Sequence, residues 1–313
     1  MYGKVKIFTG SAHPELAREI CADLGLPLGK SELVRFANEN MMVKILENVR
    51  ESDVFVIQPS ASPVSDTLVE LLIMLDALKH ASAGRITAVL PYFPYVRSDK
   101  KDKPRISIAA RLMADLIQTA GATRVLTMDL HSPQIQGFFH IPVDQLIAAP
   151  ILCDHLARRD LSETVLVASD FGEAKEVGVY ANKLNLPIAI IDKRRHADDD
   201  RAIATNLVGS VKGKVALLVD DEVASGGTLV EACNFLIQAG AKAVEAAAVH
   251  PVLCGPALER LAQSSIRSFV FTNTLPVPAE KKLDRFTVLS VAPLFAQAIR
   301  AIHEGDSVSA LFR

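Results

Sequence analysis

Short apolar runs rich in β-branched residues alternate with amphipathic stretches along almost the whole sequence. Ten of these runs are predicted strands, at residues 5–8, 53–59, 85–93, 124–130, 164–171, 188–192, 215–221, 244–250, 268–273 and 286–292. Helical periodicity lies between them, as at 65–81, where Leu68, Leu71, Leu72 and Leu75 recur on one face. Near-continuous apolar strands that alternate with helices predict an α/β fold whose parallel sheets are covered on both faces.

The predicted strands are many for one sheet, and 313 residues are enough for two domains. We place the boundary in the stretch FHIPVDQLIAAPIL at 139–152, which contains two prolines. The sequence therefore predicts an N-terminal domain over 1–146 and a C-terminal domain over 147–313. Each half has a strand that ends in an acidic residue and a polar loop, which is where open parallel sheets bind ligands.

Composition and charge exclude several classes of protein. The net charge of −2 gives no overall field that would attract nucleic acid or an anionic membrane. No apolar run reaches the roughly 18 to 20 residues of a membrane span, and the first residues lack a signal-peptide core. The four cysteines form no Cys-x-x-Cys pair, so we expect reduced thiols in a cytoplasmic protein. No Gly-x-Gly-x-x-Gly motif follows the first strand, which argues against an oxidoreductase.

The stretch VDDEVASGGT at 219–228 has the most informative chemistry. Asp220 and Asp221 end a predicted strand, where their carboxylates can accept hydrogen bonds from paired sugar hydroxyls. The small residues that follow open a helix, and their amides, with the hydroxyls of Ser225 and Thr228, can form an anion site. An ordinary strand-to-helix turn with an aspartate cap is the alternative. The combination favours a ribose phosphate as ligand.

This stretch resembles the phosphoribosyl-pyrophosphate loop of the type I phosphoribosyltransferase fold. Five further stretches are similar to motifs of the ribose-phosphate pyrophosphokinase family, namely ALKHASAGRITAVLPYFPYVRSDKK (77–101), TMDLHSPQIQGFFHIPVDQL (127–146), IIDKRR (190–195), GPALERL (255–261) and SVSALF (307–312). The resemblance covers essentially the whole chain. It implies two tandem type I phosphoribosyltransferase-like domains, each a mainly parallel sheet flanked by helices.

The resemblance implies an enzyme that transfers the β,γ-diphosphoryl group of Mg–ATP to the C1 hydroxyl of ribose 5-phosphate and releases AMP. It implies a ribose 5-phosphate site made of Asp220, Asp221, Ala224, Ser225, Gly226, Gly227 and Thr228. Lys193 and Arg195 match the catalytic residues of a mobile loop that closes over the triphosphate. Taken alone, three adjacent cations at 193–195 more often belong to a solvated surface.

The resemblance also implies nucleotide contacts. Phe36 and Asn38, in RFANEN, match a loop in which an aromatic ring stacks on adenine, although Phe36 is also suited to a hydrophobic core. Arg97 and Asp102 match the segment that contacts ATP. In this family the RFANEN-type loop can reach the site of a neighbouring subunit, and dimers stack into hexamers, so the resemblance implies a homo-oligomer.

His131 and Asp170 match the magnesium-linked positions of the family. A lone histidine is more often structural than a ligand, but His131 follows Asp129 at the end of a predicted parallel strand. Mg²⁺ prefers carboxylate and phosphate oxygens and keeps several waters, so imidazole would be a minority ligand. The implied cofactor is Mg²⁺.

Four positions depart from the residues that are common in the family. Asn40 replaces Glu, Ser98 replaces Gln, Glu173 replaces Gly in the loop SDFGEAKEV that resembles the pyrophosphate-binding one, and Ala224 replaces Asp. These departures keep open a non-catalytic paralogue that regulates an active synthetase. A phosphoribosyltransferase that consumes the product is a further alternative, although the ATP-like segment has no role in it.

Overall fold

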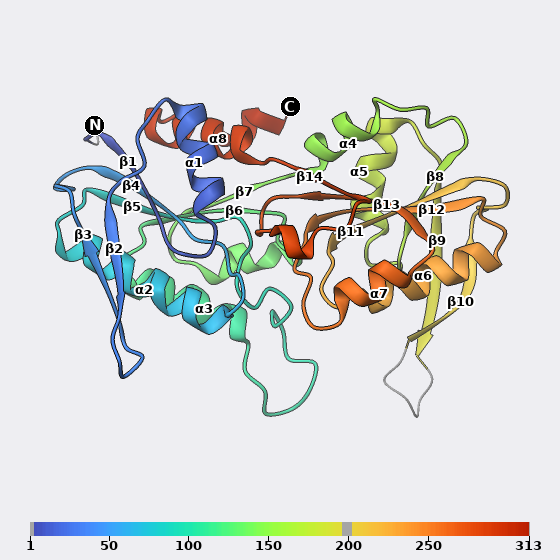
Figure 1. Cartoon of the computed structure of the whole chain (residues 1–313), viewed down its shortest axis with the longest axis horizontal. Coiled ribbons are helices and arrows are strands. Elements are labelled where there is room, and N and C mark those ends of the chain that lie inside the picture. Colours follow the sequence, from blue (N-terminus) through green and yellow to red (C-terminus); the bar gives the residue numbers. More distant parts are fainter. Residues whose placement is uncertain (1–2, 196–201, 313) are drawn as a thin grey trace. The chain divides into compact units, whose positions relative to one another are not determined.

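The computed structural model describes the backbone of residues 3–195 and 202–312, and their side chains apart from those of 193–195 and 202–205. The chain divides into two compact units, each an α/β layer structure (Figure 1). The first unit comprises Met1–Ile147, Thr274–Pro276 and Ser290–Arg313, and the second comprises Ala148–Asn273 and Val277–Leu289. None of the described helices combines the length and the apolar character that crossing a membrane requires.

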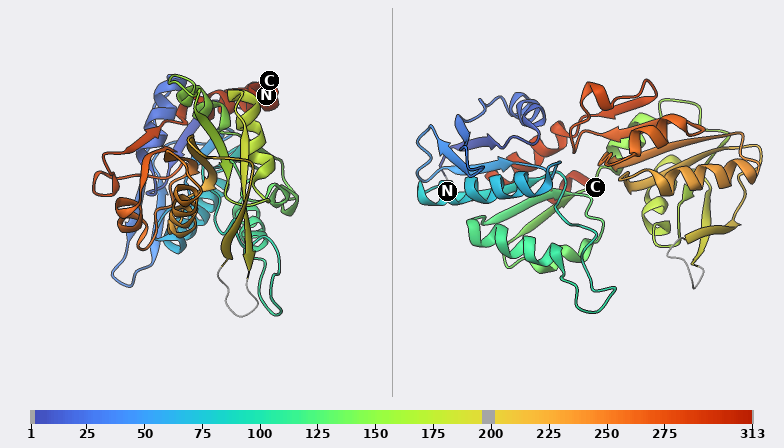
Figure 2. Two further views of the ribbon diagram at one scale, coloured as in Figure 1. Left: turned by 90° about the vertical axis from the view of Figure 1, so that its right-hand side faces the viewer. Right: turned by 60° about the horizontal axis from the view of Figure 1, so that its bottom comes forward.

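The first unit is built on a parallel sheet. Its strand order is β1 (Val5–Thr9), β4 (Asp53–Ile57), β5 (Arg85–Leu90), β6 (Arg124–Met128) and β7 (Val143–Leu146). One face is covered by α1 (Pro14–Leu24) and α8 (Ala292–Glu304), and the other by α2 (Val64–His80) and α3 (Ala109–Ala120), which lie side by side (Figures 1 and 2). Every residue of β4 is buried, as expected for a strand covered on both faces. Short 3₁₀ turns are η1 (Pro133–Phe138) and η3 (Val308–Phe312).

A separate antiparallel hairpin extends the first unit. It consists of β2 (Ser31–Arg35) and β3 (Met41–Ile45), and β3 packs against α2 (Figure 1). The hairpin was not among the predicted strands. Its strands contain charged residues and are mostly exposed or half-buried, so they lack the continuous apolar pattern of the buried sheet.

The second unit has a larger sheet. Its strand order is β10 (Ala202–Val208), β9 (Ile188–Arg195), β8 (Thr164–Ala168), β11 (Val215–Glu222), β12 (Ala243–His250), β13 (Ile266–Thr272) and β14 (Phe286–Leu289). All neighbours pair in parallel except β9 and β10. The helices α4 (Ala149–Leu156) and α5 (Ala174–Leu184) cover one face, and α6 (Gly227–Gln238) and α7 (Ala257–Gln263) cover the other (Figure 1). A 3₁₀ turn, η2 (Ala279–Lys281), precedes β14.

The prediction of an α/β fold with two mainly parallel sheets is confirmed, and each of the ten predicted strand segments overlaps a strand of the structure. The division of the chain differs from the expected one. The predicted C-terminal domain over 147–313 includes residues 290–313, which the structure assigns to the first unit. The reason is the packing of α8, whose buried face contacts α1.

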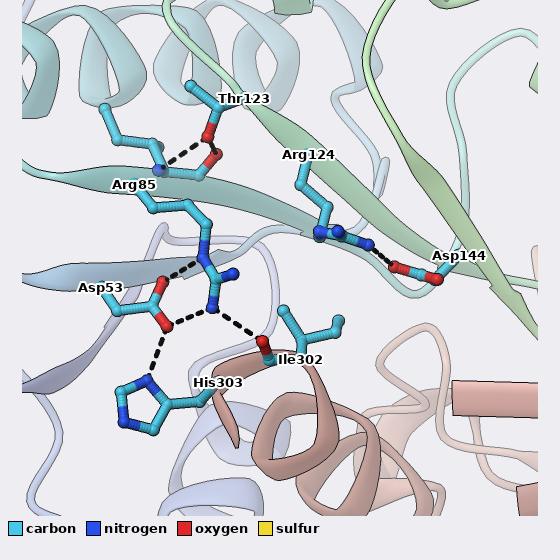
Figure 3. A network of polar contacts seen from close by, with 8 residues as sticks. Asp53, Arg85, Thr123, Arg124, Asp144, Ile302 and His303 are labelled. Atoms are coloured by element: carbon cyan, nitrogen blue, oxygen red, sulfur yellow. Dashed lines mark hydrogen bonds and ion pairs between the residues drawn. The ribbon is translucent and has the colours of Figure 1, made fainter. Parts of the chain in front are cut away.

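A buried ion pair holds α8 to the sheet of the first unit (Figure 3). Asp53 and Arg85 face each other at the starts of β4 and β5, and the Asp53 side chain is fully buried. Arg85 Nε donates to Asp53 Oδ1 at 2.7 Å, and Arg85 Nη2 donates to the carbonyl oxygen of Ile302 at 2.9 Å. His303 Nδ1 lies 2.8 Å from Asp53 Oδ2. One carboxylate therefore joins two strands to the last turn of α8.

We expect Asp53→Ala to destabilise the protein by about 3 kcal/mol or more, because it leaves the buried Arg85 guanidinium without its carboxylate. The matched control is Asp144→Ala, which removes the ion pair with Arg124 on neighbouring strands (Figure 3). That pair is partly exposed, so its loss should cost only up to about 1 kcal/mol. Urea or thermal unfolding measures both, and equal losses would contradict the role of Asp53.

Candidate active site

The carboxyl ends of β8 and β11 meet at one edge of the second unit's sheet. The two strands pair in parallel and in continuous register. Ser169 and Asp170 follow β8 directly. Asp220 and Asp221 are near the end of β11, just before its last residue, Glu222. The structure thus brings Asp170 and the predicted ribose-binding aspartates to the same edge, which is where ligands bind in open parallel sheets.

A loop of small residues connects β11 to α6. It includes the predicted phosphate-binding residues Ala224, Ser225, Gly226, Gly227 and Thr228. Gly226 has a φ of 72°, in the left-handed region that favours glycine, and a Cβ there would lie 3.2 Å from Cδ2 of Leu261. Gly226 is also the N-cap of α6, which begins without a side-chain cap in the part of the chain that the structure describes. The first amides of α6 are therefore oriented to bind an anion.

Asp220 lies in a negative environment. Its burial, the charge of Glu173 and the neighbouring Asp221 raise the pKa of the Asp220 carboxyl well above its ordinary value. A backbone bond acts in the opposite direction, because Asp221 N–H donates to Asp220 Oδ1 at 2.9 Å. A proton, a cation or hydrogen-bond donors from a ligand would relieve this repulsion. The hydroxyls of a ribose are suitable donors.

Acidic side chains close the turn after β8. Asp170 Oδ1 accepts hydrogen bonds from the N–H of Gly172 at 2.7 Å and the N–H of Glu173 at 3.3 Å. The Glu173 carboxylate accepts from the N–H and from the hydroxyl of Ser169, both at 3.0 Å. Asp170 is half-buried, and these bonds fix its carboxylate at the sheet edge next to β11.

In the first unit, the segments after β5 and β6 contain predicted nucleotide and metal residues. Arg97 is exposed in the connection from β5 to α3, and His131 is exposed just after β6. Asp99 joins the two segments, because its Oδ2 accepts from Ser132 Oγ at 2.5 Å and from Gln134 Nε2 at 3.2 Å. The structure therefore brings the Arg97 and His131 segments together.

Two of the predicted nucleotide residues, Phe36 and Asn38, lie in the turn between β2 and β3. Phe36 N–H donates to the carbonyl oxygen of Asn40 at 2.9 Å, and Asn38 Oδ1 accepts from Asn40 N–H at 3.2 Å. Phe36 is 48% exposed, so it is not a core residue and its ring is accessible for stacking. Asp102 is exposed in the same connection as Arg97.

The predicted catalytic residues Lys193 and Arg195 lie at the end of β9. Their backbones pair with Ala204 and Ala202 of β10 in an antiparallel register. The expected loop therefore begins as a strand, and its continuation at 196–201 lies outside the described residues, as do the side chains of Lys193 and Arg195.

Sequence reasoning missed the clamp made by Asp99, Ser132 and Gln134. All three are polar residues in segments that follow parallel strands, and the position of Asp99 two residues after Arg97 was the available signal. The pattern could not reveal which donors the carboxylate would meet, because Ser132 and Gln134 are more than thirty residues further along the chain.

Two family models match this chain: the N-terminal domain of ribose phosphate pyrophosphokinase at residues 5–121, and the phosphoribosyl synthetase-associated domain at residues 200–313. The ribose-phosphate pyrophosphokinase of Caldanaerobacter subterraneus subsp. tengcongensis is 52% identical over 309 residues and 98% of both chains. That of Bacillus subtilis is 46% identical, over 98% of this chain and 97% of its own. A crystal structure of phosphoribosylpyrophosphate synthetase from Mycobacterium smegmatis, at 43% identity, matches with a TM-score of 0.92 over 97% of this chain and 100% of that chain.

Parallel sheets, acidic strand ends and a small-residue loop at a helix N-terminus are the features of an α/β fold that binds its ligands at the carboxyl edge of the sheet. The relatives match over nearly the full length of the chain and not over one motif alone. The chain belongs to the ribose-phosphate pyrophosphokinase family, as its motifs implied.

We expect Asp220→Asn to raise the thermal midpoint of the unliganded protein, and to raise it more as the pH increases. Because the folded pKa of Asp220 is raised, the folded state holds a proton that the unfolded chain releases. Wild-type stability therefore falls as the pH rises from the ordinary carboxyl pKa through the raised one, and the neutral amide removes this loss. Thermal unfolding between pH 5 and 8 measures the effect.

The control for this prediction is Asp160→Asn. Hydrogen bonds from Ser162 lower the pKa of the Asp160 carboxyl, so its replacement should give no gain in stability. A pH-independent difference between Asp220→Asn and wild type would contradict the electrostatic environment described for Asp220.

Proposed function

We propose that this chain transfers the β,γ-diphosphoryl group of ATP to the C1 hydroxyl of ribose 5-phosphate, giving 5-phosphoribosyl 1-pyrophosphate and AMP. The observation that carries the proposal is the edge of β11, where two carboxylates lie next to the loop that opens α6. The names and the full-length similarity of the relatives support this function over a regulatory paralogue or a phosphoribosyltransferase.

In the proposed enzyme, Asp220 and Asp221 hold the ribose hydroxyls. Residues 224–228 bind the 5-phosphate through backbone amides and the hydroxyls of Ser225 and Thr228. The geometry supports this assignment, because the amides at the start of α6 have no side-chain cap in the described structure. Ala224, which replaces the common Asp, lacks a side-chain donor or acceptor but keeps its backbone amide and carbonyl.

In the first unit, the ring of Phe36 would stack on the adenine, with Asn38 in the same loop. Arg97, with Asp102 nearby, would contact the phosphates or the purine. The exposed ring of Phe36 supports a stacking role, and the clamp at Asp99 supports a defined position for the Arg97 segment. Lys193 and Arg195 would neutralise the charge that develops on the transferred diphosphoryl group.

Mg²⁺ is the cofactor that we propose, with His131 and Asp170 contributing to its binding. The described residues contain no group of three or more potential ligands, so phosphate oxygens and water must complete the coordination, which is how Mg²⁺ is usually held. The donor chemistry fits, because Asp170 lies on the edge where burial and neighbouring carboxylates raise the pKa of Asp220. When bound, Mg²⁺ would supply positive charge to the phosphates.

We further propose a cytoplasmic homo-oligomer built from dimers and extending to a hexamer, without nucleic-acid or membrane partners. The cysteine side chains support a reducing compartment, since all four are free thiols and three of them are buried: Cys21, Cys153 and Cys233. Burial raises the pKa of each of these three thiols to about 11, so they stay protonated and unreactive.

Lys193→Ala should reduce AMP release on the order of a thousandfold or more, because the variant loses a cation that stabilises the transferring group. Chromatography of reactions that contain ATP, ribose 5-phosphate and Mg²⁺ measures AMP. Lys183→Ala, at an exposed position in the last turn of α5, is the control and should keep wild-type activity. No AMP from folded wild-type protein would favour the regulatory paralogue.

Asp221→Ala should raise the KM for ribose 5-phosphate about 10- to 100-fold or abolish turnover, since a charged hydrogen-bond acceptor for the ribose is lost. The KM for ATP should change less. Glu231→Ala, at an exposed position on α6, removes the same charge without touching the strand end. Unaltered kinetics in Asp221→Ala would contradict the assignment of the ribose site.

A further inference from the structure

The turn after β8 already binds a carboxylate of the chain itself, that of Glu173. The carboxylate of Glu173 spans two donors of one residue: Oε2 accepts from the N–H of Ser169 and Oε1 from its hydroxyl, each at 3.0 Å. A second carboxylate, that of Asp170, accepts hydrogen bonds from the backbone amides of Gly172 and Glu173. The amides of this turn therefore converge on negatively charged groups.

The position of the turn explains why an anion is stable there. It lies at the carboxyl end of a parallel strand and leads into α5, an eleven-residue helix whose N-cap is Glu173. The partial positive charge of a helix N-terminus and the aligned amides both favour negative groups. A phosphate oxygen would be stabilised by the same donors as the Glu173 carboxylate.

A comparable pair of hydrogen bonds from a serine to a glutamate occurs in the first unit, but there the glutamate is buried. Glu70, from α2, accepts the N–H of Ser11 at 2.8 Å and its hydroxyl at 2.5 Å, in the loop between β1 and α1. Glu70 is buried, and Gln58 Nε2 also donates to it at 3.1 Å. Its carboxylate is therefore buried and accepts hydrogen bonds from two separate segments of the unit.

Glu173, in contrast, lies in the turn itself, four residues after Ser169, and is only half-buried. After burial, its negative charge is the next cause of the raised pKa of Asp220 on the neighbouring strand, so an ionised Asp220 disfavours the position of Glu173 at Ser169. A half-buried carboxylate that shares its donors with a ligand site can be displaced by an anion that forms stronger charge-assisted hydrogen bonds. Rotation of the Glu173 side chain towards solvent would free the amide and hydroxyl of Ser169.

We propose that Glu173 is an internal competitor for the diphosphate group: its carboxylate occupies the donors of Ser169 in the unliganded protein, and a diphosphate must displace it to bind there. This inference rests on the proposed function, which supplies diphosphate-containing substrate and product. It assigns to Glu173 the control of diphosphate affinity, with Ser169 as the donor that both anions share.

The test measures binding of inorganic pyrophosphate to the full chain by calorimetry, without added divalent cation. Glu173→Gln removes the charge but can still accept the Ser169 N–H, whereas Glu173→Ala removes both the charge and the competing acceptor. We expect pyrophosphate to bind about tenfold more tightly to the Ala variant, with the Gln variant between it and wild type. If pyrophosphate binding is too weak to detect in the wild type but measurable in the Ala variant, that outcome also supports the inference.

Two further measurements make the outcome specific. Glu176→Ala removes an exposed carboxylate from the first turn of α5 and should leave pyrophosphate affinity unchanged. Without ligand, Glu173→Ala should lower the thermal midpoint slightly, because the Ser169 donors lose their partner, and Glu173→Gln should lower it less. A change of more than a few degrees would indicate that the turn is disrupted, in which case the Gln variant decides.

Unchanged or weaker pyrophosphate binding in both Glu173 variants would overturn the inference, as would equal tightening in Glu176→Ala. The result is independent of turnover. If the protein releases no AMP from ATP and ribose 5-phosphate but the Glu173 variants bind pyrophosphate more tightly, the proposed function fails and the role of Glu173 stands. If AMP is released and pyrophosphate affinity does not respond to Glu173, the inference alone fails.

Discussion

Parallel strand pairing is the constraint on which the rest of this structure depends. Neighbouring parallel strands end at the same edge of a sheet, so β8 and β11 deliver Asp170, Asp220 and Asp221 to one place although the residues are distant in the chain. Helical crossovers cover both faces and bury the strands. The edge is lined by backbone amides and acidic side chains. Their hydrogen-bonding groups need partners from local turns or from ligands.

The edge is organised at a cost in stability. Burial, the charge of Glu173 and the neighbouring Asp221 raise the pKa of the Asp220 carboxyl well above its ordinary value. Arrangements of this kind are common at functional sites, because the unfavourable contacts become favourable when a ligand or cation arrives. The buried pair of Asp53 and Arg85 shows the opposite design, since its charges are matched within the protein and need no ligand.

The sequence predicted the parts of the fold that follow from local pattern. Continuous apolar runs marked the buried strands, and the aspartate pair before a small-residue loop marked the edge at β11. Features that depend on contacts between distant residues were not predictable. The clamp at Asp99 needs Ser132 and Gln134, and the β2–β3 hairpin has no apolar run to identify it. Departure from the family pattern did single out Glu173, but only the structure showed that its carboxylate holds Ser169.

The assignment of α8 to the first unit has a consequence for the order in which the protein can be assembled. A ribosome makes Asp53, Arg85 and α1 early, but Ile302 and His303 emerge only after the whole second unit. Until then α1 lacks the helix that packs against it. The first unit therefore completes its packing after translation of the second, and the nascent chain carries an uncovered helix face that chaperones can recognise during that interval.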